Sequence, residues 1–186
     1  MVERRGRLVL LGAMLMSTGC AQALPPPGTV QDLRVGASTG RNGTTRLQGR
    51  SSRTPVVVEV STEHRIRVRE GACRGSTTAG PELVVEYDDP AEALHVVFRN
   101  RTTPVSLLVR SPDGRWHCRR MLEHYAVPWV GFSHPERGRY ELWVLRDEED
   151  NFSPGLDGAF MFASDLAKLQ EALPKYSRQT NWSFYR

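Results

Sequence analysis

The stretch RSPDGRWHCRR, residues 110–120, decides the fold class, because a turn signal stands between two strand-like runs. In Ser111-Pro112-Asp113-Gly114, proline sets φ at the second position and glycine closes the fourth, which is the composition of a type I turn. The turn is expected to join a strand over 104–110 to a strand over 115–119. Two antiparallel strands joined in this way indicate a β-protein.

Side chains alternate between the two faces of a strand, so the residues of the run 115–119 fall into two sets. Trp116 and Cys118 should share one face, while Arg115, His117 and Arg119 share the other. We expect the tryptophan and the cysteine to face the core and the charged set to face water. A reactive thiol requires an exposed, electropositive setting, so this arrangement argues against one at Cys118.

Further strand-like runs occupy residues 54–165, most of them about ten residues apart and many separated by turn signals. This spacing predicts an antiparallel β-sandwich or barrel of about eight or nine strands. The runs are 55–60, 64–69, 83–87, 93–99, 104–110, 115–119, 127–132, 139–146 and 159–163.

One short helix is expected near the C-terminus, over residues 164–173. Ser164 is a plausible N-cap, leucines follow at helical spacing, and Pro174 ends the helix. Residues 166–186 therefore form a C-terminal helix and an aromatic tail. The tail either packs on its own domain or docks on a partner. Its aromatic residues, the candidate partner-binding set, are Tyr176, Trp182, Phe184 and Tyr185.

The N-terminus has the pattern of a secretory signal peptide, assigned to residues 1–19. Arg4, Arg5 and Arg7 precede an apolar run from Leu8 to Met16. A membrane-spanning helix needs about 20 apolar residues, so this run is too short to be one. A signal peptide is excluded from the folded domain.

The signal ends in Ser17-Thr18-Gly19-Cys20-Ala21, which resembles the lipobox of bacterial lipoproteins, although Ser17 stands where that family usually has leucine. The resemblance implies that Cys20 is acylated and anchors the chain in a membrane. Ala21 implies the outer membrane by the family's sorting rule, with the domain facing the periplasm or the cell surface. The alternative is ordinary signal-peptidase cleavage, after Ala21 or Ala23.

The net charge and the cysteine content further restrict the class of protein to which the chain belongs. Removing residues 1–19 takes three arginines and one glutamate from 25 basic and 21 acidic residues, which leaves 22 and 20 and a net charge of +2. The remaining arginines are interleaved with acids, so no nucleic-acid partner is expected. With Cys20 lipidated, Cys73 and Cys118 remain, and two cysteines in an exported chain favour a disulfide.

Residues 20–53 are rich in Pro, Gly, Ser, Thr and Arg and contain few large apolar residues. This composition predicts a flexible, lipidated linker. The folded domain is then assigned to residues 54–165.

Four segments of the domain together resemble bacterial pre-peptidase C-terminal (PPC) domains. They are CRG (73–75), PELVVEY (81–87), SLLVRSPDGRWHC (106–118) and GRYELWVL (138–145). The resemblance implies a jelly-roll-like β-sandwich on an exported protein. Similar family members continue after the second cysteine with aspartates that could bind a cation, where this chain has Arg119-Arg120-Met121.

The densest acidic stretch, RDEEDNFSPGLDG (146–158), offers oxygen ligands of the kind that calcium prefers. The candidate ligands are Asp147, Glu149, Asp150 and Asp157. The stretch lacks the Asp-x-Asp-x-Asp-Gly order of a calcium loop, and a solvated loop is the alternative. A zinc site at His117 and His124 is disfavoured, because their spacing matches no usual zinc finger.

No nucleophile motif, metalloprotease motif or phosphate-binding glycine loop is present. We therefore expect a non-catalytic envelope lipoprotein without a cofactor, which binds another envelope protein or a polymer. A calcium-dependent carbohydrate-binding module and an uncharacterised hydrolase are the alternatives.

Overall fold

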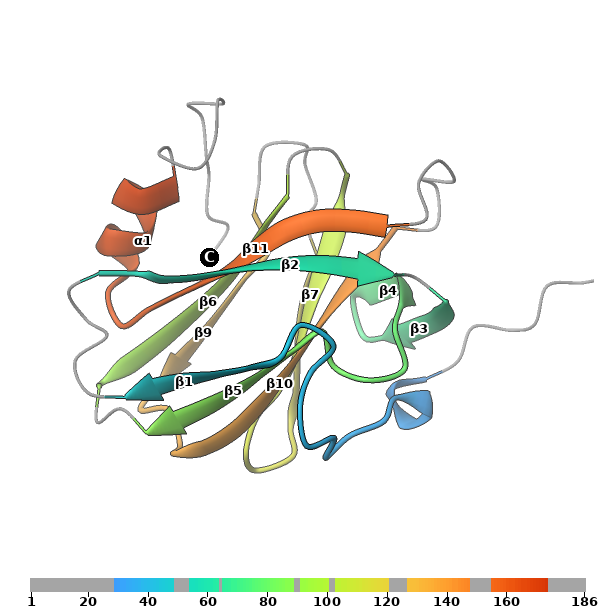
Figure 1. Cartoon of the computed structure of the whole chain (residues 1–186), viewed down its shortest axis with the longest axis horizontal. Coiled ribbons are helices and arrows are strands. Elements are labelled where there is room, and N and C mark those ends of the chain that lie inside the picture. The colour runs from blue at the N-terminus through green and yellow to red at the C-terminus, as the bar shows by residue number, and fades with distance from the viewer. Residues whose placement is uncertain are drawn as a thin grey trace, which may run out of the picture.

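The alternating runs of the sequence pair into two β-sheets that pack face to face, as the computed structural model in Figure 1 shows. The structure describes residues 29–48, 54–63, 65–88, 91–100, 103–120, 127–147 and 155–173. These ranges contain eleven strands, one 3-10 helix and one α-helix. The chain is thus an all-β sandwich with a single short helix near its C-terminus.

Strand β10 is the centre of the larger sheet. One of its edges pairs with β7, and the other pairs with β5 and then, at Arg146, with β4. Strand β8 extends the sheet beyond β7, β1 extends it beyond β5, and β3 extends it beyond β4. The bounds are β1 Thr44–Gln48, β3 Ile66–Glu70, β4 Cys73–Thr77, β5 Leu83–Asp88, β7 Val105–Arg110, β8 Trp116–Arg120 and β10 Gly138–Arg146.

The smaller sheet has the order β2-β11-β6-β9, and all of its pairs are antiparallel. Its strands are β2 Val56–Glu63, β6 Ala93–Asn100, β9 Trp129–Ser133 and β11 Gly155–Ala163. In the larger sheet, every pair is antiparallel except β1 with β5, which is parallel.

The main core lies between the two sheets. Alternate residues of β7, such as Leu107 and Val109, face alternate residues of the smaller sheet, such as Phe98 and Phe160. Phe98 and Phe160 are fully buried and their rings meet edge to face, 5.0 Å apart. Burial of each such side chain stabilises the fold by roughly 1.5–3 kcal/mol.

A second core covers the outer face of the larger sheet. Val30 and Leu33, in and after the 3-10 helix η1 (Val30–Asp32), pack with Val68, Trp143 and Cys73. Trp143 is fully buried there. Because both faces of β10 are covered, seven consecutive residues of this strand are buried, and the strand shows no polar face.

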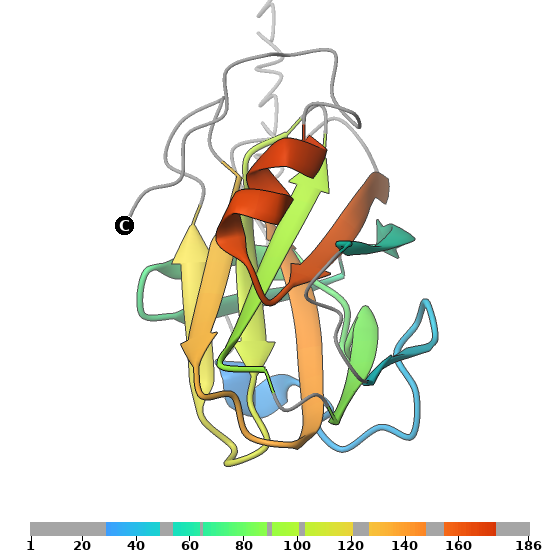
Figure 2. The same cartoon turned by 90° about the vertical axis from the view of Figure 1, so that its left-hand side faces the viewer.

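A third core covers the outer face of the smaller sheet, where helix α1 (Leu166–Ala172) lies (Figure 2). Leu169 of this helix packs with Met161 and Val97. The helix was expected over 164–173 with Ser164 as its N-cap, but the N-cap is Asp165, whose Oδ1 accepts a 2.8 Å hydrogen bond from the Ala167 amide. In the described part of the chain, no helix is both long and apolar enough to span a membrane.

The linker predicted over 20–53 is wrong for residues 29–48. Val30, Leu33 and Leu47 are buried, and β1 forms a parallel ladder with β5. Three apolar residues spread over eighteen positions give no periodic signal, so the composition of the stretch obscured its packing. The second missed strand, β4, is short, polar and contains glycine.

The orientation predicted for β8 is confirmed for Trp116, Cys118 and the two arginines and is wrong for His117. Trp116 and Cys118 share a face, which is the outer face of the larger sheet, and they border the second core. His117 points the other way and does not face water. Its ring lies 4.8 Å from that of Phe132, which packs on the main core from β9.

Candidate functional site

The β-turn predicted at Ser111–Gly114 is present, since the Gly114 amide donates to the Ser111 carbonyl at 2.9 Å. The Ser111 hydroxyl lies 2.5 Å from a carboxylate oxygen of Asp113 and 3.0 Å from His117 Nε2. This hydrogen bond from Ser111 is the main cause that lowers the pKa of Asp113 to about 2.

The Ser111 hydroxyl has one proton, and the carboxylate of Asp113 is the stronger acceptor, so Ser111 donates to Asp113. His117 Nε2 must then carry a proton and donate to Ser111 Oγ. Burial lowers the pKa of His117 and favours the neutral imidazole that such a tautomer needs. His117 therefore contacts the turn through Ser111, whose own proton is directed to Asp113.

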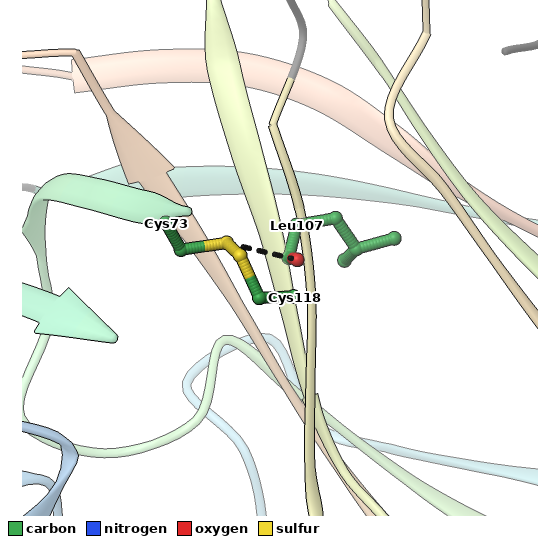
Figure 3. Close-up of a disulfide and its surroundings, with 3 residues drawn as sticks. All are labelled: Cys73, Leu107 and Cys118. Carbon is green, nitrogen blue, oxygen red and sulfur yellow. Dashed lines mark hydrogen bonds between the residues drawn. A yellow bond between two sulfur atoms is a disulfide. The ribbon is translucent and has the colours of Figure 1, made fainter. Parts of the chain in front are cut away.

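The predicted disulfide between Cys73 and Cys118 is present and joins β4 to β8 (Figure 3). The two Cα atoms lie 5.7 Å apart, within the ordinary range. Cys73 is fully buried, and its sulfur lies 3.7 Å from the Leu107 carbonyl oxygen of β7, between the bridged strands. Both thiols are consumed, so neither cysteine offers a nucleophile or a metal ligand.

The predicted calcium ligands do not converge where the structure describes them. Asp147 binds Arg120 at the end of the larger sheet. Asp157 is exposed on β11 of the smaller sheet, opposite Ser61. Glu149 and Asp150 lie outside the described residues, and within those residues no three His, Cys, Asp or Glu side chains gather to hold a metal.

Three further sets of predicted residues also lie outside the described part of the chain. They are the signal segment 1–19, the lipidation site Cys20, and the tail residues Tyr176, Trp182, Phe184 and Tyr185.

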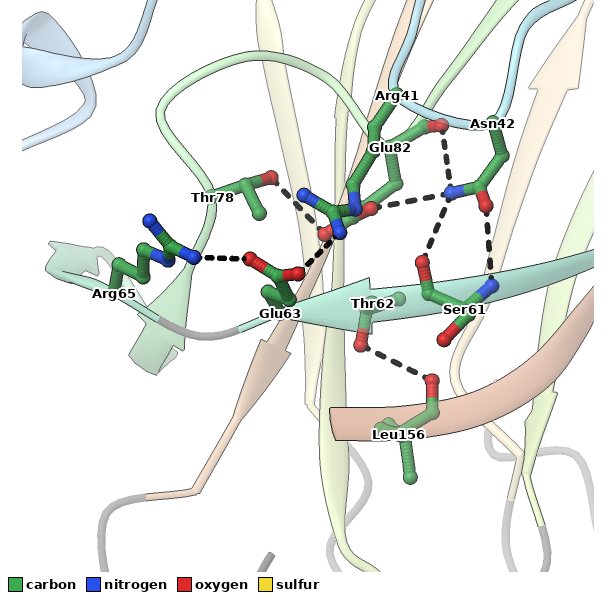
Figure 4. Close-up of polar contacts among 9 residues, drawn as sticks. All are labelled: Arg41, Asn42, Ser61, Thr62, Glu63, Arg65, Thr78, Glu82 and Leu156. Carbon is green, nitrogen blue, oxygen red and sulfur yellow. Dashed lines mark hydrogen bonds and ion pairs between the residues drawn. The ribbon is translucent and has the colours of Figure 1, made fainter. Parts of the chain in front are cut away.

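The structure instead shows a recess at one end of the sandwich, which we call the arginine recess. Figure 4 shows the polar contacts at and behind this recess. It encloses about 630 Å³ where the chain passes from β2 to β3 and where two loops, 39–43 and 78–82, approach each other. It is lined by Thr39, Gly40, Arg41, Glu63, Arg65, Ile66, Thr78, Ala79, Gly80 and Pro81.

Glu63 holds the two arginines of the recess. One of its carboxylate oxygens lies 2.5 Å from Arg41 and the other 2.8 Å from Arg65. The hydrogen bond from Arg41 is the largest influence that lowers the pKa of Glu63. The side chain of Arg65 is 77 % exposed, so its guanidinium stays accessible from solvent. These contacts use one nitrogen of each guanidinium, whereas each carries several N–H donors.

Behind the arginines, Glu82 is fully buried. The Thr78 hydroxyl donates to one carboxyl oxygen at 3.0 Å, and Asn42 Nδ2 lies 3.3 Å from the other. Burial is the dominant cause and raises the pKa of Glu82 to about 7, against the lowering effect of these hydrogen bonds and of Arg41. The charge behind the recess therefore changes near neutral pH.

Asn42 connects this group to the smaller sheet. Its amide group donates to the Ser61 carbonyl at 3.2 Å and accepts from the Ser61 amide at 3.1 Å, so it occupies the open edge of β2. The recess residues were missed in the sequence because Arg41 and Asn42 fell within the predicted linker. A glutamate next to an apolar run, as in PELVVEY, was the one available signal for Glu82.

A second hollow, of about 730 Å³, is lined by Thr103 and by residues of β2, β6 and β11 in the smaller sheet. Asp157 and Glu59 are its acidic residues, and Arg99 is its basic one. Asp157, predicted as a calcium ligand, thus lines a hollow of mixed charge.

No family model matches the chain, and it matches no curated protein. Among solved structures it is similar to PliG of Aeromonas hydrophila, a periplasmic lysozyme inhibitor of g-type lysozyme, with a TM-score of 0.38 and 10% identity over 64% of this chain and 94% of that one. It is also similar to the pre-peptidase C-terminal domain of a collagenase from Bacillus anthracis, with a TM-score of 0.35 and 10% identity over 66% and 94%. Both TM-scores are low, so the sandwich assignment rests on the strand pairing described above.

Proposed function

We propose that the chain is an exported, lipid-anchored, non-catalytic binding protein of the bacterial cell envelope, and that the arginine recess receives an acidic group of its partner. The observation that carries the proposal is the pair of guanidinium groups of Arg41 and Arg65, held by Glu63 at the mouth of a preformed hollow. Planar guanidinium groups bind carboxylates through paired N–H donors.

Export is supported by two features. The disulfide between Cys73 and Cys118 is typical of chains that fold in an oxidising compartment. The first 20 residues have the pattern of a lipoprotein signal that ends at Cys20.

The hydrogen bonds made by Ser111 favour a binding role over catalysis. The Ser111 hydroxyl donates to Asp113, so its proton is directed to that carboxylate and not to His117. In the arginine recess, the described lining contains no serine, cysteine or histidine next to the arginines. Such a recess can hold an anion.

Binding can be tested by NMR titration of the oxidised mature chain, with Cys20→Ser, against a tetraglutamate peptide and an oligogalacturonate, with maltotetraose as the neutral control. We expect the acidic probes to shift amide signals of residues 39–43, 63–66 and 78–82. The double variant Arg41→Gln with Arg65→Gln should lose these shifts. Equal shifts with maltotetraose, or none in these segments with either acidic probe, would refute the recess as an anion site.

Lipidation is tested separately by intact-mass analysis of the protein extracted from a bacterial envelope. The expected mass is that of residues 20–186 plus acyl chains, and Cys20→Ser should abolish the addition. An unmodified chain that starts at residue 22 or 24 would contradict the anchor.

A further inference from the structure

The β3–β4 hairpin presents a row of arginines on the face that points away from the second core. In the antiparallel ladder of the hairpin, Arg69 stands opposite Arg74 and Arg67 stands opposite Ser76. Cross-strand partners share a face, and alternate residues of one strand do as well, so Arg67, Arg69 and Arg74 point the same way. We call this surface the arginine face. The other side of the hairpin carries Ile66, Val68 and Cys73, which pack in or against the second core.

The arginine face carries more positive charge than its neighbours neutralise. Arg69 and Arg74 are exposed, and among the described residues neither has an acidic partner. Glu70 stands opposite Cys73, on the inner side of the hairpin. Like charges opposite each other destabilise a strand pair, so the fold itself gains nothing from the Arg69–Arg74 pair.

Two further acids among the described residues are engaged elsewhere. Glu63 binds Arg41 and Arg65, and Asp32 accepts a hydrogen bond from the Thr29 amide at 2.7 Å.

The N-terminal entry of the chain into the domain lies beside this hairpin. Val30 and Leu33 pack with Ile66 and Val68 in the second core, and Figure 1 shows the blue N-terminal segment next to β3 at the same end of the sandwich. The chain between Cys20 and Thr29 has nine peptide steps, which span at most about 30 Å even when fully extended. A lipid on Cys20 would therefore hold this end of the sandwich close to a bilayer.

We propose that the arginine face binds the anionic headgroups of the membrane that carries the lipid anchor, so that the domain lies with the β3–β4 hairpin against the bilayer. This inference rests on the proposed lipid anchor for its geometry. An acyl anchor and a basic surface together bind a membrane more stably than either does alone. Each arginine close to an anionic surface raises partitioning about fivefold, and the effect falls within a Debye length.

Vesicle co-sedimentation of the oxidised, unlipidated mature chain (Cys20→Ser) tests the surface without the anchor. One vesicle population is phosphatidylcholine alone, and the other is an equal mixture of phosphatidylcholine and phosphatidylglycerol. We expect binding to the anionic vesicles, loss of that binding at high salt, and none to the neutral vesicles. Absence of a preference for the anionic vesicles overturns the proposal.

A pair of matched variants locates the surface. Arg69→Gln with Arg74→Gln should lower partitioning at least about tenfold. Arg46→Gln with Arg119→Gln removes two exposed arginines from β1 and β8 and should leave partitioning close to that of the parent chain. Equal losses in the two variants would show a response to net charge alone and would overturn the assignment to the hairpin.

Thermal midpoints and near-UV circular dichroism confirm that both variants are folded. Because the vesicle assay uses a chain without lipid, its result is independent of whether Cys20 is acylated in cells. An unmodified Cys20 would remove the anchor, while the vesicle result would still decide whether the arginine face binds anionic lipid.

Discussion

Gly36 and Glu141, 105 residues apart in the chain, are joined by a hydrogen bond in which the Gly36 amide donates to Glu141 Oε1 at 2.6 Å. Glu141 is 1% exposed in the centre of β10 and also contacts Arg110 and Arg139, each at 3.4 Å. The hydrogen bond fixes the N-terminal segment over the second core. It explains how a stretch with the composition of a linker becomes part of the domain.

The Gly36–Glu141 contact predicts a local and a global effect of Glu141→Ala. Removing the carboxylate leaves the Gly36 amide and Arg110 without this acceptor and takes from Arg139 one of its two acidic partners, which should lower the free energy of unfolding by about 2–3 kcal/mol. Urea denaturation measures this loss, and hydrogen exchange should rise most in residues 29–36. Glu86→Ala removes an exposed partner of Arg139 at 3.6 Å and should cost less than about 1 kcal/mol. Similar costs for both variants would contradict the role of Glu141.

The disulfide predicts a large loss of stability in Cys73→Ala with Cys118→Ala. The bond spans 45 residues, and the chain-entropy model assigns such a loop about 4 kcal/mol, as an upper figure. Guanidinium denaturation of the oxidised parent and the double variant compares the two. Because Cys73 is fully buried, reductant should also open the bond in the native protein far more slowly than in denaturant. Equal reduction rates in the two states would contradict the burial.

The raised pKa of Glu82 predicts that the free energy of unfolding falls as the pH rises. Its folded pKa, about 7, is above the ordinary value of 4.5, so the folded state holds the proton more tightly than the unfolded state. The stabilisation is complete below about pH 4.5 and is lost as the pH rises through about 7. Its size is about 3 kcal/mol.

Glu82→Gln keeps the shape of the protonated side chain and removes the titration. The variant should therefore show a flatter dependence of unfolding free energy on pH between about 5 and 8 than the parent chain. Denaturation curves across that pH range measure the difference. Coinciding slopes would mean that the pKa of Glu82 is the same in the folded and unfolded states, which contradicts the effect of its burial.

Glycine positions offer a prediction with two internal controls. A Cβ at Gly75 would lie 2.1 Å from the Arg146 carbonyl oxygen, at a φ of +145°, so Gly75→Ala should prevent close pairing of β4 with β10 and cost more than about 3 kcal/mol. At Gly36, φ is +74° but the space is open, so Gly36→Ala should cost about 1 kcal/mol. At Gly80 neither constraint applies, and Gly80→Ala should be nearly neutral. Thermal melts rank the three, and any other order contradicts the close approach at Gly75.

Several features of the fold could be predicted because they depend on residues that are close together in the sequence. The Ser-Pro-Asp-Gly turn at 111–114, the nine strand runs and the pairing of Cys73 with Cys118 could all be predicted. Each depends on a local preference or on counting: proline and glycine set backbone angles, strand side chains alternate, and an exported chain with two cysteines left over tends to pair them.

The sequence by itself thus determined the strands, the turn and the residues that share a face, such as Trp116 and Cys118. Tertiary structure alone decided which face is covered, and it turned Trp116 outward to the second core and His117 toward Phe132. The arginine recess and the buried Glu82 also depend on tertiary structure. The reason is physical: alternation has the same period whichever face is buried, and burial depends on segments such as residues 29–36 that arrive from far along the chain.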